Sequence, residues 1–131
     1  MSAIVPIARS LYLCDYHVGY PNGKVDLYGT FKAIRPASYP YMKGPFVCFA
    51  QLTNGLGEMT IHFDIRRSSD MSLVDWSGPR TLRFPNRDVL VQVVYTFPGC
   101  TFPEHGLYLV ELHCDNTWVA DTVLHLREVP A

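Results

Sequence analysis

Residues 59–66 read Met-Thr-Ile-His-Phe-Asp-Ile-Arg, and apolar and polar side chains alternate along this stretch without a break. Successive side chains of an extended strand point to opposite faces. One face therefore carries Met59, Ile61, Phe63 and Ile65, and the other carries Thr60, His62, Asp64 and Arg66. The pattern predicts an antiparallel strand with one buried face and one solvent-exposed polar face.

Runs of the same kind recur along the whole chain, separated by turn residues. Asn22-Gly23, Asn54-Gly55 and Asp115-Asn116 each lie between two strand-like runs. These residue types accept the positive φ angles of tight hairpin turns, and a turn about every 8–12 residues is typical of a β-sandwich or barrel. We predict an all-β protein whose strands lie at about residues 9–17, 24–34, 45–53, 58–67, 79–84, 89–97, 107–114 and 117–128.

Three longer stretches are predicted to be irregular, at residues 36–44, 68–78 and 98–106. Residues 70–76 can form a single helical turn, because Ser69 or Asp70 can cap it. In the last hairpin, a two-residue turn at Asp115-Asn116 would place Asp121 opposite the buried Val110. We therefore expect one extra residue, a β-bulge, near residues 120–122.

Length and composition limit the classes of protein that fit. The 131 residues correspond to one domain, residues 1–131, and the 48 % apolar and 18 % charged residues predict a well-filled core. The net charge is −1 and the arginines are scattered, so we expect no nucleic-acid partner. No run of 18 apolar residues is present, so we expect no membrane span.

The N-terminus and the cysteines indicate a compartment. Residues 1–9 lack the basic start and the unbroken apolar run of a secretion signal. The four cysteines are even in number and allow two disulfides, but disulfides are rare without secretion and a chain of this length does not need them. We expect a cytoplasmic protein whose cysteines are reduced: Cys14, Cys48, Cys100 and Cys114.

Several segments carry a likeness to a known group of proteins. They are residues 13–15 (Leu-Cys-Asp), residues 23–31 (Gly-Lys-Val-Asp-Leu-Tyr-Gly-Thr-Phe), Ile34-Arg35, Tyr39-Pro40, residues 53–58, residues 102–108 and residues 118–120. Together they resemble a family of short, uncharacterised bacterial proteins. The resemblance implies an immunoglobulin-like antiparallel β-sandwich of about seven to eight strands, and it implies no activity, substrate or catalytic residue.

The residues that favour chemistry most are His62 and Asp64. Residues two apart on a strand point the same way with Cβ atoms about 7 Å apart, so this pair can act together in acid–base catalysis. No nucleophile motif accompanies the pair, and we interpret it as part of an exposed polar face and predict no enzyme. His62, His113 and His125 lie in separate predicted strands without the spacing of metal ligands, so we predict no metal and no other cofactor.

Aromatic residues next to prolines in two predicted loops, residues 36–44 and 98–106, favour a binding function. Rigid aromatic side chains are typical anchors at protein interfaces and in sugar-binding surfaces. We predict a non-catalytic interaction or accessory protein, a monomer or weak homodimer whose partner is another protein. The alternative is a small-ligand or carbohydrate-binding module that uses the same residues. The candidate contacts are Tyr39, Tyr41, Phe97, Phe102 and His105. Pro40, preceded by an aromatic residue at a turn, is a candidate for a cis peptide bond.

Overall fold

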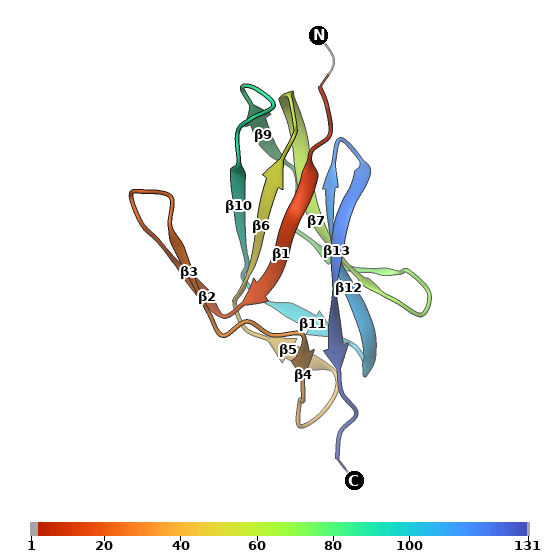
Figure 1. Ribbon diagram of the computed structural model, residues 1–131. Helices are drawn as coiled ribbons and strands as arrows, with labels where there is room; N and C mark the ends of the chain where they lie inside the picture. The colour runs from red at the N-terminus through yellow and green to blue at the C-terminus, as the bar shows by residue number, and fades with distance from the viewer. Residues whose placement is uncertain (1–2, 131) are drawn as a thin grey trace.

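The computed structural model describes residues 3–130, so Met1, Ser2 and Ala131 of the predicted domain lie outside the described residues (Figure 1). The protein is all-β, and no helix occurs within residues 3–130. The strands are β1 (Ile7–Cys14), β2 (Tyr16–Gly19), β3 (Val25–Tyr28), β4 (Ala33–Ile34), β5 (Tyr41–Lys43), β6 (Phe46–Thr53), β7 (Gly57–Arg67), β8 (Leu73–Trp76), β9 (Arg80–Phe84), β10 (Val91–Phe97), β11 (Cys100–Phe102), β12 (Gly106–Cys114) and β13 (Thr117–Leu126).

Two sheets make up most of the molecule. One has three strands in the order β1-β6-β10, and the other has six, in the order β4-β13-β12-β7-β8 with β9 also paired to β7. All pairings in these sheets are antiparallel except that of β13 with β4. The two smaller sheets each have two strands, β2 with β3 and β11 with β5. Figure 1 shows the β2–β3 hairpin extending away from the main body.

The core lies between the three-stranded and the six-stranded sheet. The inner side chains of β7 and β12, such as Phe63, Ile65, Val110 and Leu112, belong to the same buried cluster as Phe46 and Leu52 of β6. Burial of such apolar side chains stabilises the fold by about 1.5–3 kcal/mol for each large residue. Among residues 3–130, every buried side-chain nitrogen or oxygen has a hydrogen-bond partner.

The last hairpin confirms the predicted turn and shifts the predicted bulge. Cys114 pairs with Thr117 across a two-residue turn in which Asp115 and Asn116 have φ angles of 49° and 61°. The register then shifts between Leu112–Ala120 and His113–Trp118, so the extra residue is Val119 rather than one of residues 120–122. The bulge does what the pattern required, because Asp121 now pairs with Glu111 and Val110 with Thr122.

Other predicted elements are divided or replaced. The stretch 9–17 becomes the end of β1 and the start of β2, because the chain bends at Asp15, and 24–34 becomes β3 and β4, because it bends at Gly29 and Lys32. The helical turn predicted in residues 70–76 is wrong: Leu73–Trp76 is strand β8, which pairs with β7. Hydrogen bonding to the exposed edge of β7 outweighs the weak local capping signal there. The Tyr39–Pro40 peptide bond is cis, as the sequence indicated.

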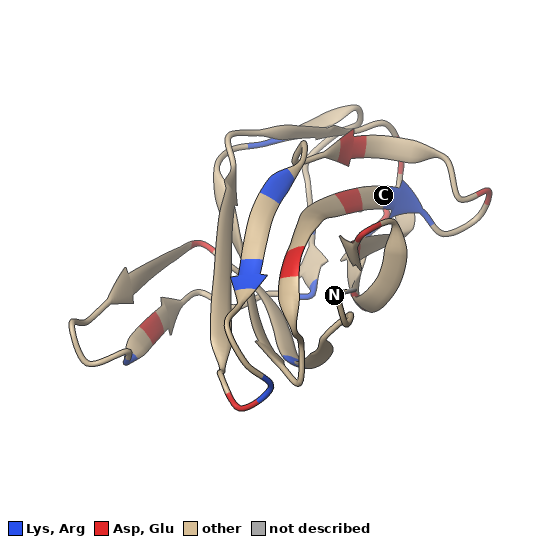
Figure 2. Cartoon of the chain, turned by 90° about the horizontal axis from the view of Figure 1, so that it is seen from above, with Lys and Arg blue, Asp and Glu red and all other residues tan. Residues whose placement is uncertain are grey.

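The four cysteines are all buried and free, in agreement with the sequence analysis. Burial and the neighbouring carboxylate of Asp75 raise the pKa of the Cys100 thiol to about 12. Within residues 3–130 there is no helix of the length and hydropathy needed to cross a membrane. Lysines and arginines are interspersed with aspartates and glutamates over the strands and loops rather than gathered in one stripe (Figure 2).

Candidate functional site

The two aromatic loops predicted to form a binding surface do meet in the structure. Residues 41–43 pair with residues 100–102 as β5 and β11. Two of the five predicted contacts, however, lie in the core: Phe97 is 1 % exposed and Phe102 is 0 % exposed. The expectation that these two rings contact a partner is corrected, because Phe97 stacks on Phe46 of β6 and Phe102 packs against Tyr108 of β12 within the core.

The other predicted contacts are only partly available. Tyr39 and Tyr41 are half-buried, and the Tyr39 hydroxyl donates a hydrogen bond to the carbonyl oxygen of Arg127 at 2.5 Å. Burial raises the pKa of Tyr39. His105 is exposed, with its ring 6.4 Å from that of Tyr39. This end of the molecule therefore offers a partner less aromatic surface than the sequence predicts.

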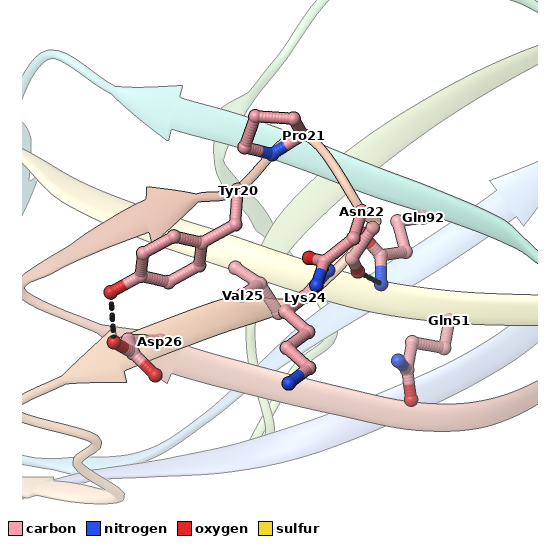
Figure 3. A pocket seen from close by; sticks show the side chains of 9 residues that line it. Tyr20, Pro21, Asn22, Lys24, Val25, Asp26, Gln51 and Gln92 are labelled. Carbon is pink, nitrogen blue, oxygen red and sulfur yellow. Dashed lines mark hydrogen bonds between the residues drawn. The ribbon is translucent and has the colours of Figure 1, made fainter.

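A pocket lies against the projecting β2–β3 hairpin (Figure 3). It is an open groove of about 830 Å³ between the hairpin turn, residues 20–26, and the side chains of Gln51 and Gln92. Two of its polar side chains are already paired: the Tyr20 hydroxyl donates to Asp26 at 2.6 Å and the Gln92 amide donates to the Gly23 carbonyl at 3.2 Å. A wide-open groove of this kind is a weak candidate for a specific small-molecule site, since such sites enclose most of the ligand.

The outer face of the six-stranded sheet brings together more chemistry than either of these regions. Residues directly opposite each other on neighbouring strands share a face. His62 of β7 lies opposite His113 of β12, which lies opposite Trp118 of β13. Asp64 of β7 lies opposite Glu111 on one side and Trp76 of β8 on the other. We refer to His62, Asp64, Arg66, Glu111 and His113 as the polar cluster.

Arg66 lies at the centre of the hydrogen bonds in the polar cluster. Its Nη2 atom donates to Oδ2 of Asp64 at 2.9 Å and its Nε atom donates to Oε1 of Glu111 at 3.1 Å. Its third nitrogen donates to the backbone carbonyl of Met71 at 3.1 Å, in the turn between β7 and β8. One guanidinium thus faces two carboxylates, which leaves one negative charge uncompensated while both histidines are neutral.

The two histidines lie against the same carboxylates. Their rings are stacked, with centroids 4.9 Å apart and planes 2° from parallel. Nε2 of His62 is 3.5 Å from Oδ1 of Asp64, and Nε2 of His113 is 3.7 Å from Oδ2 of Asp64 and 3.1 Å from Oε1 of Glu111. The rings of His62 and Trp76 form a T-shaped pair, with centroids 5.9 Å apart.

This geometry corrects the prediction of a solvent-exposed polar face on β7. Asp64 is 5 % exposed and Glu111 is 6 % exposed, although both lie on the outer side of the sheet. The side chains of Arg66, His62 and His113 lie against the two carboxylates and shield them from water. Buried carboxylates persist only when they are paired and hydrogen-bonded, and Arg66 meets that requirement here.

Large apolar side chains surround the polar cluster on the outer face. Trp76 is 50 % exposed and Trp118 is 54 % exposed, and these are the two tryptophans of the chain. Leu73, Leu107 and Val123 are also exposed. Their strand pairing places them on this face: Leu73 lies opposite Arg66, Leu107 opposite His125, and Val123 opposite Leu109. Apolar side chains gathered on one exposed face commonly mark an interaction site.

Sequence reasoning found part of this site and missed its assembly. His62-x-Asp64 was identified, and His113 was considered with His62 as a metal ligand. His125, the third histidine of that set, is exposed and seven positions beyond Trp118 on β13, far from the cluster. Arg66 and Glu111 were missed as partners. The available signal was the alternation of Glu111 and His113 on the polar side of 107–114, but only the pairing register of β7 with β12 brings them to Asp64 and His62.

The fold and the site define an all-β protein whose main sheet carries a buried polar cluster between two exposed tryptophans. Residues 9–127 match the model of a family described as a family of unknown function, DUF6941. The chain therefore belongs to this family, which agrees with the resemblance to uncharacterised proteins found in the sequence. No curated protein and no solved structure matches the chain.

Proposed function

We propose that this protein is a non-catalytic binding protein that recognises another protein through the outer face of its six-stranded sheet. The observation that carries the proposal is the pair of half-exposed tryptophans, Trp76 and Trp118, on either side of the polar cluster. Tryptophan and arginine are the residues most enriched among those that dominate interface energies. Aromatic side chains and arginine are also enriched at the cores of protein interfaces.

The contacts within the polar cluster support binding rather than catalysis. Asp64 and Glu111 are both held by Arg66, and the histidines lie against these carboxylates rather than against a hydroxyl or thiol nucleophile. The four thiols are buried in the core and the pKa of each is raised, which keeps them in the unreactive protonated form.

The remaining parts of the proposal concern fold type and setting. Two main sheets on either side of one core support an immunoglobulin-like β-sandwich, a fold that binds partners through faces, edges and loops. Four free cysteines support a reducing compartment, so we propose a bacterial cytoplasmic protein. We propose a monomer or weak homodimer in the absence of its partner, which sedimentation velocity tests directly.

The test is affinity capture from extracts of the native host, followed by a binding measurement with the purified partner. We expect Trp76→Ala and Trp118→Ala each to weaken the affinity about 30-fold, which corresponds to the ~2 kcal/mol typical of an interface anchor. The melting temperature changes little because both rings are about half exposed. The matched control replaces Tyr16 and Tyr28, a stacked exposed pair on the β2–β3 hairpin, with alanine.

The outcomes separate this proposal from its alternatives. Equal affinity for the wild type and both tryptophan variants, with loss in the hairpin variant, would move the binding surface to the hairpin. Binding to an oligosaccharide rather than to a protein, lost in the same tryptophan variants, would favour the carbohydrate-binding alternative. That alternative would then use Trp76 and Trp118 instead of the predicted loop aromatics.

A further inference from the structure

The donor atoms of three side chains in the polar cluster converge on one point. A ring nitrogen of His62, a carboxylate oxygen of Asp64 and a ring nitrogen of His113 all lie within 4.8 Å of one another. In the part of the chain that the structure describes, no other group of three His, Cys, Asp or Glu side chains converges in this way. All three residues come from the central strands β7 and β12, so a rigid sheet fixes their positions.

The spacing of these donors is close to that of a metal centre. Two ligand atoms each about 2.1 Å from a tetrahedral ion lie about 3.4 Å apart. The nitrogens of His62 and His113 lie 3.5 and 3.7 Å from the two oxygens of Asp64. Both Nε2 atoms face the carboxylate of Asp64, but the stacked rings lie in parallel planes, so one imidazole must turn out of the stack for both nitrogens to bind the same ion.

We propose that His62, Asp64 and His113 bind a divalent transition-metal ion of the zinc type. Imidazole nitrogen and carboxylate oxygen together suit zinc, iron, nickel and copper, whereas magnesium and calcium require oxygen ligands. Two carboxylates that face a single guanidinium favour an additional cation. Three protein ligands leave a coordination position open toward the outer face, where a water molecule or a ligand atom from a partner completes the shell. The proposal goes beyond the binding function above and does not depend on it.

Arg66 is the internal competitor of the metal. In the metal-free protein its guanidinium supplies the positive charge beside Asp64 and Glu111, with hydrogen bonds of 2.9 and 3.1 Å. The ion takes over the neutralisation of Asp64, while Arg66 keeps Glu111 and the carbonyl of Met71 as partners. Glu111 also competes with the metal, since its Oε1 atom lies 3.1 Å from Nε2 of His113 and that contact must be given up when the same nitrogen binds the ion.

The test is a zinc titration of untagged protein freed of metal by a chelator, followed by calorimetry. We expect one Zn²⁺ ion for each chain. His62→Ala and His113→Ala should each weaken the affinity more than about 100-fold, because loss of outer-shell partners alone costs 10–100-fold. Arg66→Gln should tighten binding about 10-fold by removing the competing charge. The matched control is His125→Ala, an exposed histidine on the same sheet face, which should bind zinc as the wild type does.

Two further measurements keep the test decisive if an alanine variant loses its fold. His62→Gln keeps most of the side-chain volume beside Asp64, and its thermal melt shows whether the chain is folded when zinc binding is lost. Replacement of zinc by Co²⁺ gives visible absorption bands that report nitrogen and oxygen ligands in the wild type and disappear in the His113 variant. Failure of the wild type to bind zinc, or equal binding by the His62, His113 and His125 variants, would overturn the proposal.

Discussion

Strand β7 has an inner face that is shielded from water along its length and an outer face that is shielded only at Asp64, and the two are shielded by different means. On the inner face Phe63 and Ile65 pack among apolar side chains of both main sheets. On the outer face Asp64 is nearly as buried, but it is surrounded by Arg66, His62 and the side chains of β12. One face is closed by apolar packing and the other by a network of charges and imidazole rings.

The difference shows that the stability of the fold explains the burial of the inner face but not that of the charges on the outer face. Apolar burial stabilises the fold directly. A buried charge network roughly offsets its own desolvation cost, so stability alone does not explain its presence. Burial of charge on the outer face, between two exposed tryptophans, is therefore better explained by binding than by folding.

The largest effect should come from the inner face. Phe63→Ala removes a fully buried ring and leaves a cavity between the sheets, so we expect the free energy of unfolding to fall by about 3–5 kcal/mol. Urea denaturation measures this loss. A loss below about 1 kcal/mol would mean that the inner face is not the tightly packed core described here.

A smaller loss should follow from breaking the outer network at its centre. Arg66→Gln leaves Asp64 and Glu111 as neighbouring buried carboxylates without a countercharge. Because the side chain of Arg66 is partly exposed, we expect a loss of about 2 kcal/mol, below the range for fully buried pairs. Urea denaturation of the variant with and without zinc also connects the two proposals, since a bound ion should restore the lost stability. Unchanged stability would show that water, not Arg66, neutralises the carboxylates.

Substitution of His62 should cause a smaller loss of stability, and the same substitution at His125 is its control. His62→Ala removes the stacked ring and the contacts with Asp64 and Trp76, and we expect a loss of about 1 kcal/mol in thermal melts. His125→Ala, at an exposed position, should stay within about 0.5 kcal/mol of the wild type. Equal values for the two variants would return His62 to the ordinary exposed strand face that the sequence predicts.

The smallest change in the free energy of unfolding near neutral pH should come from the buried thiols of the core. The pKa of Cys100 is about 12 in the folded protein, against an ordinary value of 9.0, because burial and Asp75 disfavour the thiolate. The folded state thus holds this proton more tightly than the unfolded state, so its contribution to stability is constant below pH 9 and is lost as the pH rises above that value. Urea denaturation between pH 7 and 10 should show the decline, and Cys100→Ala should make it shallower. An unchanged slope in the variant would contradict burial of this thiol.

Much of the fold could be predicted because it rests on local signals. The alternation of residues 59–66 and the turns at Asn54-Gly55 and Asp115-Asn116 specify strands and hairpins without reference to the rest of the chain. The β-bulge was also foreseen, because Asp121 had to be kept out of the core, but its position at Val119 depends on packing. Strand β8 was missed because only pairing with β7 makes it extended.

The site could be predicted only in part, since it depends on register between distant strands. Alternation shows that His62 and Asp64 face away from the core, but it does not show what covers them. The contacts with Arg66, Glu111 and His113 arise when β7 and β12 pair, about fifty positions apart in the sequence. The prediction of Phe97 and Phe102 as contact residues was wrong for the same reason. Their local sequence resembles that of exposed interface aromatics, but the fold buries both rings in the core.

The central claim is that the polar cluster is maintained for binding and not for stability. The most direct test is the free energy of unfolding of a variant in which the three charged residues of the polar cluster are made apolar, Asp64→Leu with Arg66→Met and Glu111→Leu. Replacing every member of a buried charge network with apolar residues of similar volume is commonly neutral or stabilising by about 1–4 kcal/mol. We predict that the triple variant is at least as stable as the wild type in urea and no longer binds zinc. A loss of several kcal/mol with the other core contacts intact would show that the network holds the sheet together, and would contradict the claim.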